Sequence, residues 1–294
     1  MTNALTIVNP IPTVLIPRQA DTDDQLLALW LHGRSRHTQR SYRYCAESFR
    51  LFVQKPLPMV TLGNIQAFAD ALEQQQLRPS SRAKRLSALK SLLAFGHRVG
   101  YLTFDVGRVM RLPVFREMLS DRIMTEAEVH RIMGLERNPR NRLLITLMYA
   151  TGVRVSELCG MTWRDLHSRP ESGQVTVFGK GGKTRSILIP PSVWDQLQAF
   201  RETAADDAPV FRSRRGGHLD PSQMLRIVHA AAKHAGLSRV ICCHAFRHSH
   251  ASHAIDRNCP LSLVQATLGH ASVASTNRYL HARPSDSSSR YLPL

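Results

Sequence analysis

Apolar residues recur at helical spacing in the first part of the chain, and this periodicity is the strongest constraint on its fold. Between residues 36 and 53, successive apolar positions lie three, four, three and one residues apart: Tyr42, Cys45, Phe49, Phe52 and Val53. This spacing places them on one face of a helix. Three more helical segments begin at capping residues, near Asp21 or Thr22, at Thr61, and at Ser80 or Ser81. We therefore predict a four-helix domain over residues 21–111, preceded by a Pro-punctuated arm over residues 1–20.

The pattern changes after residue 111. We expect a linker over residues 112–122, and a capping box of Thr125 and Glu128 opens a second domain over residues 123–283. Two apolar runs around a glycine-rich turn predict a β-hairpin with strands at 175–178 and 185–189. Helices are expected at 140–150, 192–203, 221–235, 244–256, 261–268 and 272–281. The predicted fold class is mostly α, with one small antiparallel β-sheet in the second domain and a polar tail over residues 284–294.

The net charge of +17 at pH 7 narrows the choice of partner. The chain up to Glu117 has 16 Lys and Arg against 8 acidic residues, and the remainder has 23 against 14. Both halves are basic, which favours nucleic acid as the partner over a merely basic surface. We find no apolar run long enough for a membrane helix and no signal peptide. Five irregularly spaced cysteines fit a reducing compartment, so we expect a soluble cytoplasmic protein.

Basic side chains on two of the predicted helices are candidate DNA contacts. One group lies on a different face of its helix from the apolar residues, and the other lies in the first turns of its helix, where phosphates can bind. A solvated charged face is the alternative. The candidates are Arg36, Arg40, Arg43 and Arg50 on the second helix, and Arg82, Lys84 and Arg85 on the fourth.

Two patterns early in the second domain place cations at sites that could bind a phosphate. Arg154 follows Gly152, where one helix stops and the next begins, and Lys180 lies at the glycine-flanked tip of the hairpin. Each has a structural alternative. Arg154 could pair with Glu157, and Lys180 could be a solvated turn lysine.

Two further patterns lie near the end of this domain. His244 and Arg247 are three residues apart and share one helix face. His270 ends a Leu-Gly-His run, and Tyr279 follows nine residues later. The alternatives are a pair of residues at a helix end and a half-buried tyrosine whose hydroxyl is satisfied.

In this order, the motifs resemble those of the tyrosine recombinase family, also called phage-type integrases. The layout is closest to Xer-like recombinases, and the resemblance covers residues 21–290. It implies a SAM-like DNA-binding domain followed by a catalytic domain. It also implies a site-specific DNA recombinase that acts through a covalent 3′-phosphotyrosine and a Holliday junction. The implied partners are double-stranded DNA and three further copies of the chain, in a tetramer on paired sites. The tail over residues 284–294 would pass to a neighbouring subunit.

The resemblance also implies a role for each site residue. Arg154 and Arg247 would neutralise the non-bridging phosphate oxygens, with a further donor from His270. Tyr279 would be the nucleophile. The expected base is His244 and the expected acid at the leaving 5′-oxygen is Lys180.

No cofactor and no metal is expected, because the two arginines supply the charge that a metal would bring. The Cys/His-rich stretch from Cys242 to Cys259 raises structural zinc as an alternative. Its two cysteines are adjacent and no second pair follows, which does not fit the usual spacing of zinc ligands. Two functional alternatives stay open: a type IB topoisomerase-like enzyme, and a non-catalytic DNA-binding protein of the same fold.

Overall fold

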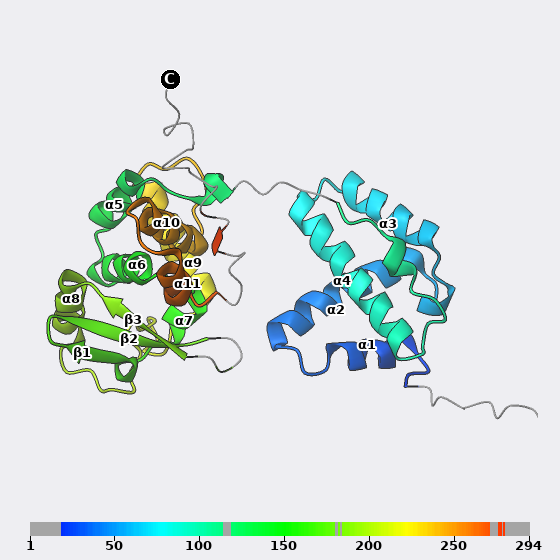
Figure 1. Ribbon diagram of the computed structural model, residues 1–294, viewed down its shortest axis with the longest axis horizontal. Coiled ribbons are helices and arrows are strands. Elements are labelled where there is room, and N and C mark those ends of the chain that lie inside the picture. Colours follow the sequence, from blue (N-terminus) through cyan, green and yellow to red (C-terminus); the bar gives the residue numbers. More distant parts are fainter. Residues whose placement is uncertain are drawn as a thin grey trace, which may run out of the picture. The chain divides into compact units, whose positions relative to one another are not determined.

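The computed structural model describes residues 19–113, 119–179, 182, 184–270, 276, 277 and 279. The chain divides into two compact units, Met1–Arg116 and Glu117–Leu294. Both are drawn in Figure 1. Three predicted features lie outside the described residues. They are residues 1–18 of the expected arm over 1–20, Lys180, and the whole tail over 284–294.

Four α-helices make up most of the first unit. They are α1 (Asp23–Leu31), α2 (Arg36–Val53), α3 (Leu62–Gln74) and α4 (Pro79–Arg98), with short 3₁₀ helices η1 (Leu57–Met59) and η2 (Val106–Val109). Thr22 caps α1 and Thr61 caps α3 through side-chain hydrogen bonds, as predicted. The start predicted for the fourth helix was wrong, since α4 begins at Pro79, with Arg78 as its N-cap. Proline suits a first helical position, where its missing N–H would have no partner anyway.

The core of the first unit forms where the apolar faces of these helices meet. Phe49 of α2, Leu26 of α1 and Ile65 of α3 are fully buried there, together with Leu89 of α4. The ring of Phe49 meets that of Phe68 edge to face, at 5.1 Å between centroids. Since this face of α2 is buried, its arginines lie on the surface that remains.

The second unit is also largely helical, with one small sheet. Its helices are η3 (Leu119–Arg122), α5 (Glu126–Leu135), α6 (Pro139–Thr151), α7 (Val155–Gly160), η4 (Trp163–Asp165), α8 (Pro191–Arg201), α9 (Pro221–His234), α10 (Cys243–Asp256) and α11 (Leu261–Leu268). The predicted capping box of Thr125 and Glu128 opens α5. Of the helix predicted at 272–281, the structure describes Thr276, Asn277 and Tyr279, and all three are helical.

Three antiparallel strands form the sheet in the order β1-β2-β3. They are β1 (Leu166–Arg169), β2 (Ser172–Phe178) and β3 (Thr184–Ile189), and Phe178 pairs with Thr184 beside the turn. The predicted hairpin is confirmed, but β1 was not predicted. Only Leu166 of β1 is buried, so the strand lacks the alternation of apolar and polar residues by which strands are recognised.

Helix α6 lies in the core of the second unit. Leu144, Ile145, Leu147 and Met148 are fully buried, and α6 packs against α10, α8 and β3. The mostly α fold class with a small antiparallel sheet is confirmed. None of the helices in the described part of the chain is long and apolar enough to cross a membrane.

Candidate active site

The site begins where α6 ends. Gly152 terminates α6 in the left-handed conformation, with φ of +60°. A Cβ on Gly152 would lie 2.8 Å from a ring carbon of His250 and 2.8 Å from a methyl group of Leu268. A glycine is therefore required both by the backbone and by the space around it. The chain then turns directly into α7, which has Arg154 as its N-cap residue.

Arg247 connects the ends of two helices. Its side chain is 4% exposed; Nη1 donates to the carbonyl of Gly152 at 2.6 Å, and Nη2 donates to that of Leu268 at 2.5 Å. These carbonyls lie at the C-terminal ends of α6 and α11, where a positive charge is favourable. Burial and the nearby charge of Arg154 lower the pKa of Arg247 to about 10. The guanidinium therefore remains charged at neutral pH.

Arg154 lies beside Arg247. Its Nη2 donates to the carbonyl of Gly269 at 3.2 Å, and this carbonyl neighbours the Leu268 carbonyl that Arg247 binds. Two guanidinium groups are thus anchored on consecutive peptide groups. One phosphate group could accept hydrogen bonds from both.

Glu157 holds the arginines in place. Its side chain is 5% exposed and bonds Arg154 through Nη1 at 2.8 Å and through the backbone N–H at 2.7 Å. Arg185 of β3 donates to the same carboxylate at 3.0 and 2.8 Å, and to the carbonyl of Thr267 at 2.7 Å. Burial alone would raise the pKa of Glu157, but the hydrogen bonds from Arg185 and Arg154 outweigh it and lower the pKa.

The ion pair of Arg154 with Glu157, raised as a structural alternative, is therefore present together with the contact to Gly269. Arg185 was missed by sequence reasoning. A signal existed, because Arg185 alternates with the buried Ile187 and Ile189 and so faces the inner side of β3. A strand arginine on an inward face needs a partner such as a carboxylate.

His270 and Tyr279 lie together. Their rings are nearly parallel, with an interplanar angle of 4° and centroids 6.3 Å apart. His270 Nδ1 is 2.9 Å from the hydroxyl of Thr276. Burial and the cations Arg247, Arg154 and Arg185 lower the pKa of His270 to about 4. The ring is therefore neutral at pH 7, with one N–H to donate.

The Tyr279 hydroxyl contacts a histidine that was not among the predicted site residues. Tyr279 is 4% exposed, and its oxygen is 2.8 Å from Nδ1 of His248. The expected base, His244, is exposed, and its ring centroid is 6.3 Å from that of His248. Desolvation, Arg247 and Arg154 lower the pKa of His244.

Five of the six predicted catalytic residues are described, and all five lie in this unit; the sixth, Lys180, lies outside the described residues.

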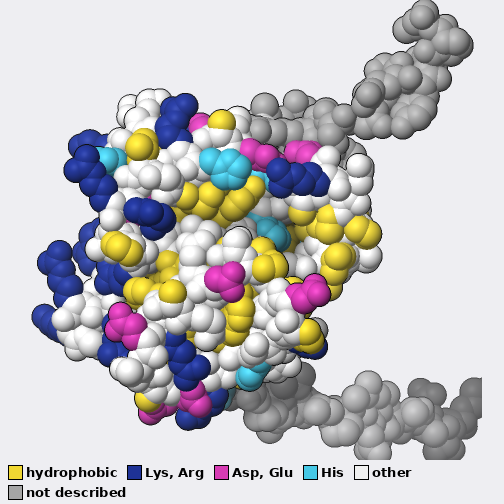
Figure 2. All heavy atoms as spheres, turned by 90° about the vertical axis from the view of Figure 1, so that its left-hand side faces the viewer, with side chains coloured by type: hydrophobic (Ala, Val, Ile, Leu, Met, Phe, Trp, Pro, Cys, Tyr) yellow, Lys and Arg dark blue, Asp and Glu magenta, His cyan; other side chains and the backbone are white. Residues whose placement is uncertain are grey.

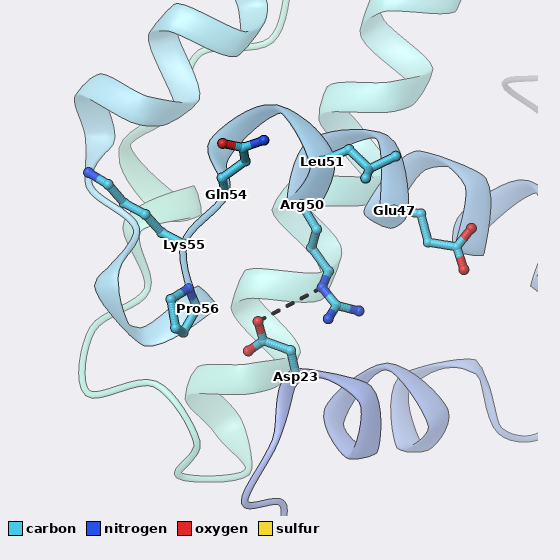
Figure 3. Close-up of a pocket in the computed structure, with 7 residues that line it drawn as sticks. All are labelled: Asp23, Glu47, Arg50, Leu51, Gln54, Lys55 and Pro56. Atoms are coloured by element: carbon cyan, nitrogen blue, oxygen red, sulfur yellow. Dashed lines mark ion pairs between the residues drawn. The ribbon is translucent and has the colours of Figure 1, made fainter.

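The predicted DNA contacts of the first unit differ in how their charges are compensated. Arg50 pairs with Asp24 at 2.6 Å, and Figure 3 shows it lying against Asp23, at 3.9 Å, in a cavity of the first unit. Arg82 forms an ion pair with Glu73. Arg85 lies over the ring of Tyr44, 5.1 Å from its centroid. The other four are exposed and have no ion pair within the described part of the chain; they are Arg36, Arg40, Arg43 and Lys84.

The second unit has a basic cavity that sequence reasoning missed. Its volume is about 880 Å³, and four arginines contribute to its lining: Arg140, Arg214, Arg215 and Arg226. The signal in the sequence was the Arg214-Arg215 pair before two glycines and the start of α9. On the face of this unit turned to the viewer in Figure 2, Lys and Arg side chains gather along one edge, and acidic side chains are scattered.

Within the described residues, no group of three or more His, Cys, Asp or Glu could hold a metal ion.

Two family models match the chain. The phage integrase family matches residues 122–286, and the phage integrase N-terminal SAM-like domain matches residues 26–100. The chain belongs to the phage integrase family. The tyrosine recombinase XerC of Mycobacterium sp. (strain JLS) is 30% identical over 281 residues, covering 89% of this chain and 93% of the relative. That of Mycobacterium tuberculosis (strain ATCC 25177 / H37Ra) is 32% identical over 279 residues, with the same coverage of each chain.

Solved structures of similar proteins have the same fold. A lambda integrase dimer bound to a COC′ core site aligns with a TM-score of 0.73 and 21% identity, over 90% of this chain and 79% of that chain. A lambda integrase tetramer bound to a Holliday junction aligns with a TM-score of 0.70 and 21% identity, over 86% and 79%. As a phage integrase family member, the chain is a site-specific tyrosine recombinase, an enzyme that cleaves DNA and transfers strands. The resemblance seen in the motifs is confirmed, and the topoisomerase-like and non-catalytic alternatives are not favoured.

Proposed function

We propose that Tyr279 attacks a DNA phosphodiester held by Arg154, Arg247 and His270. The observation that carries the proposal is the anchoring of both guanidinium groups on the consecutive carbonyls of Leu268 and Gly269. It supports one phosphate site with two positive charges. The neutral His270 ring, parallel to that of Tyr279, supports a third donor beside the nucleophile.

The reaction has two steps, and the energy of the cleaved phosphodiester bond is kept in a covalent intermediate between them. The hydroxyl proton of Tyr279 passes to a histidine base. The Tyr279 oxygen forms a bond to phosphorus as the bond from phosphorus to the leaving 5′-oxygen breaks, and the leaving oxygen takes a proton from Lys180. The product is a 3′-phosphotyrosine ester. The 5′-hydroxyl of another strand then attacks the same phosphorus and gives its proton to Lys180, and Tyr279 is released as it takes its proton back from the histidine. Because the ester retains the energy of the original bond, no nucleotide is consumed.

The proposed partners are double-stranded DNA and further copies of the chain on paired sites. Lambda integrase solved as a tetramer bound to a Holliday junction supports this assembly. In the first unit, the exposed cations of α2 and α4 would contact phosphates of the backbone. In the second unit, the arginine-lined cavity beside α9 offers a further basic surface for the duplex.

Trapping the covalent intermediate tests the proposal. On DNA with a nick close to the cleavage site, cleavage frees a short fragment that carries the 5′-hydroxyl. This fragment diffuses away and cannot attack the phosphotyrosine, so the protein–DNA adduct accumulates. Wild-type protein should form it in the presence of a chelator and without nucleotide, whereas Tyr279→Phe should form none and still bind DNA. Adducts that persist in Tyr279→Phe would show that another residue is the nucleophile. A strict need for a divalent metal in cleavage would contradict the proposed role of the arginines.

A further inference from the structure

The Tyr279 hydroxyl lies at hydrogen-bond distance from a second histidine of α10, His248. This histidine directly follows Arg247 on α10, and its Nδ1 lies 2.8 Å from the Tyr279 oxygen. The two ring centroids are 5.8 Å apart, with an angle of 46° between the planes. The distance is that of a short hydrogen bond, so one of these two groups donates to the other.

His244 is placed differently. It is exposed near the start of α10, one turn before His248, and its ring centroid lies 6.3 Å from that of His248. Residues four apart on a helix share a face, so both imidazoles lie on the same side of α10. Of the two, His248 touches the atom that reacts.

The surroundings of Tyr279 increase the need for this contact. The tyrosine belongs to a buried cluster with Leu119, Ile123, Val264 and Leu268. Because Tyr279 is only 4% exposed, a phenol that loses its proton there needs an acceptor within the protein at hydrogen-bond distance. His248 meets this requirement when its proton is on Nε2, which leaves the Nδ1 lone pair free to accept from the hydroxyl.

We propose that His248 orients the Tyr279 hydroxyl and accepts its proton during cleavage. The O–H bond of Tyr279 breaks and the proton moves to Nδ1 of His248. The electron pair of the oxygen forms the bond to phosphorus, and the 5′-oxygen leaves with a proton from the general acid. In strand transfer, His248 returns its proton to Tyr279. This assignment rests on the proposed function, in which Tyr279 is the nucleophile.

Two substitutions at position 248 separate orientation from proton transfer. His248→Ala removes both, whereas His248→Asn keeps a polar atom near the position of Nδ1 but cannot take a proton at neutral pH. His167→Ala is the matched control, because His167 lies exposed on β1. The full-length proteins are compared by thermal unfolding, by DNA binding, and by the rate of covalent adduct formation on nicked DNA.

We expect both variants to bind DNA like the wild type and to form the adduct about 100-fold more slowly, the effect of losing a general base. Added imidazole should speed up His248→Ala and leave the wild type and His167→Ala unchanged. If His248→Ala unfolds, the rate of adduct formation by His248→Asn tests the proposal instead. A wild-type rate in His248→Asn, or a slow rate in His248→Ala that imidazole leaves unchanged, would overturn the proton assignment.

Faster cleavage by His248→Ala would also overturn it, since the bond would then restrain the nucleophile. Tyr279→Phe, run in parallel, keeps the two proposals apart. Adducts in Tyr279→Phe would refute the proposed nucleophile. Their absence there, together with a wild-type rate in His248→Ala, would refute only the role of His248.

Discussion

At the scale of single residues, Glu157 is a buried carboxylate that organises the positive charges of the site. It is 5% exposed and accepts hydrogen bonds from Arg154 and Arg185. Glu157→Gln leaves two guanidinium groups with a neutral partner. The free energy of unfolding at pH 7 should fall by about 3 kcal/mol, the scale of breaking a buried ion pair. Urea unfolding of both proteins measures the difference.

The same residue predicts a pH dependence. Because the folded state lowers the pKa of Glu157, its contribution to stability is present above the ordinary carboxyl pKa of about 4.3 and is lost as the pH falls through the lower, folded value. The stability difference between wild type and Glu157→Gln should therefore shrink below about pH 4. The control is Glu171→Gln, because Glu171 is exposed in the turn between β1 and β2. A difference that stays constant down to acid pH would mean that the carboxylate charge is not what stabilises the site.

The proposed role of Lys180 also gives a prediction at this scale. If Lys180 protonates the leaving 5′-oxygen, Lys180→Ala should cleave ordinary DNA at least about 100-fold more slowly. A 5′-sulfur is a better leaving group and needs no proton, so DNA carrying it should restore most of the rate. Equal defects of Lys180→Ala on both substrates would assign Lys180 to phosphate binding.

At the scale of elements, the site is assembled from helix ends. The C-termini of α6 and α11 supply the carbonyls of Gly152, Leu268 and Gly269, and the N-terminus of α7 supplies Arg154. Because backbone groups at helix ends lack partners within the helix, they are available to hold the arginines. The positions of the two cations therefore depend on where these helices stop.

Gly152→Ala tests this dependence. The new methyl group would meet His250 and Leu268 at 2.8 Å, in a backbone conformation that disfavours a side chain. The free energy of unfolding should fall by about 1–3 kcal/mol, and the rate of adduct formation should fall with it because the Gly152 carbonyl moves. Gly134→Ala is the matched control: Gly134 lies within α5 with open space around it, so alanine should stabilise by about 0.5–1 kcal/mol. Equal stabilities of the two variants in urea would contradict the steric argument.

The elements and residues that sequence reasoning found are those with strong local signals. Helix α2 was predicted at its observed bounds because its apolar positions are periodic; the cap at Ser35 is seen only in the structure. Strand β1 was missed because it buries a single residue. Arg185 and His248 were missed as site residues because their partners Glu157 and Tyr279 lie 28 and 31 residues away in the chain. Arg185 on β3 reaches Glu157 on α7, and Tyr279 reaches His248 on α10, only once the second unit has folded.

At the scale of the whole molecule, both units are basic, but only some of the cations are free to bind a polyanion. Arg50 and Arg82 of the first unit pair with carboxylates, whereas three arginines of α2 are exposed and have no ion pair within the described residues. Sequence counts treat these charges alike. The structure therefore divides the predicted contacts into those that a phosphate can use at once and those already compensated.

The salt dependence of DNA binding measures this division. Each phosphate contact contributes about 0.9 to the slope of log affinity against log salt concentration. Replacing Arg36, Arg40 and Arg43 together by glutamine should therefore reduce the slope by as much as about 2.7 and weaken binding to all sequences alike. Arg50→Gln should change the slope less than any one of these three substitutions, because Asp23 and Asp24 already compensate its charge. An unchanged slope in the triple variant would place the DNA on another face of the first unit.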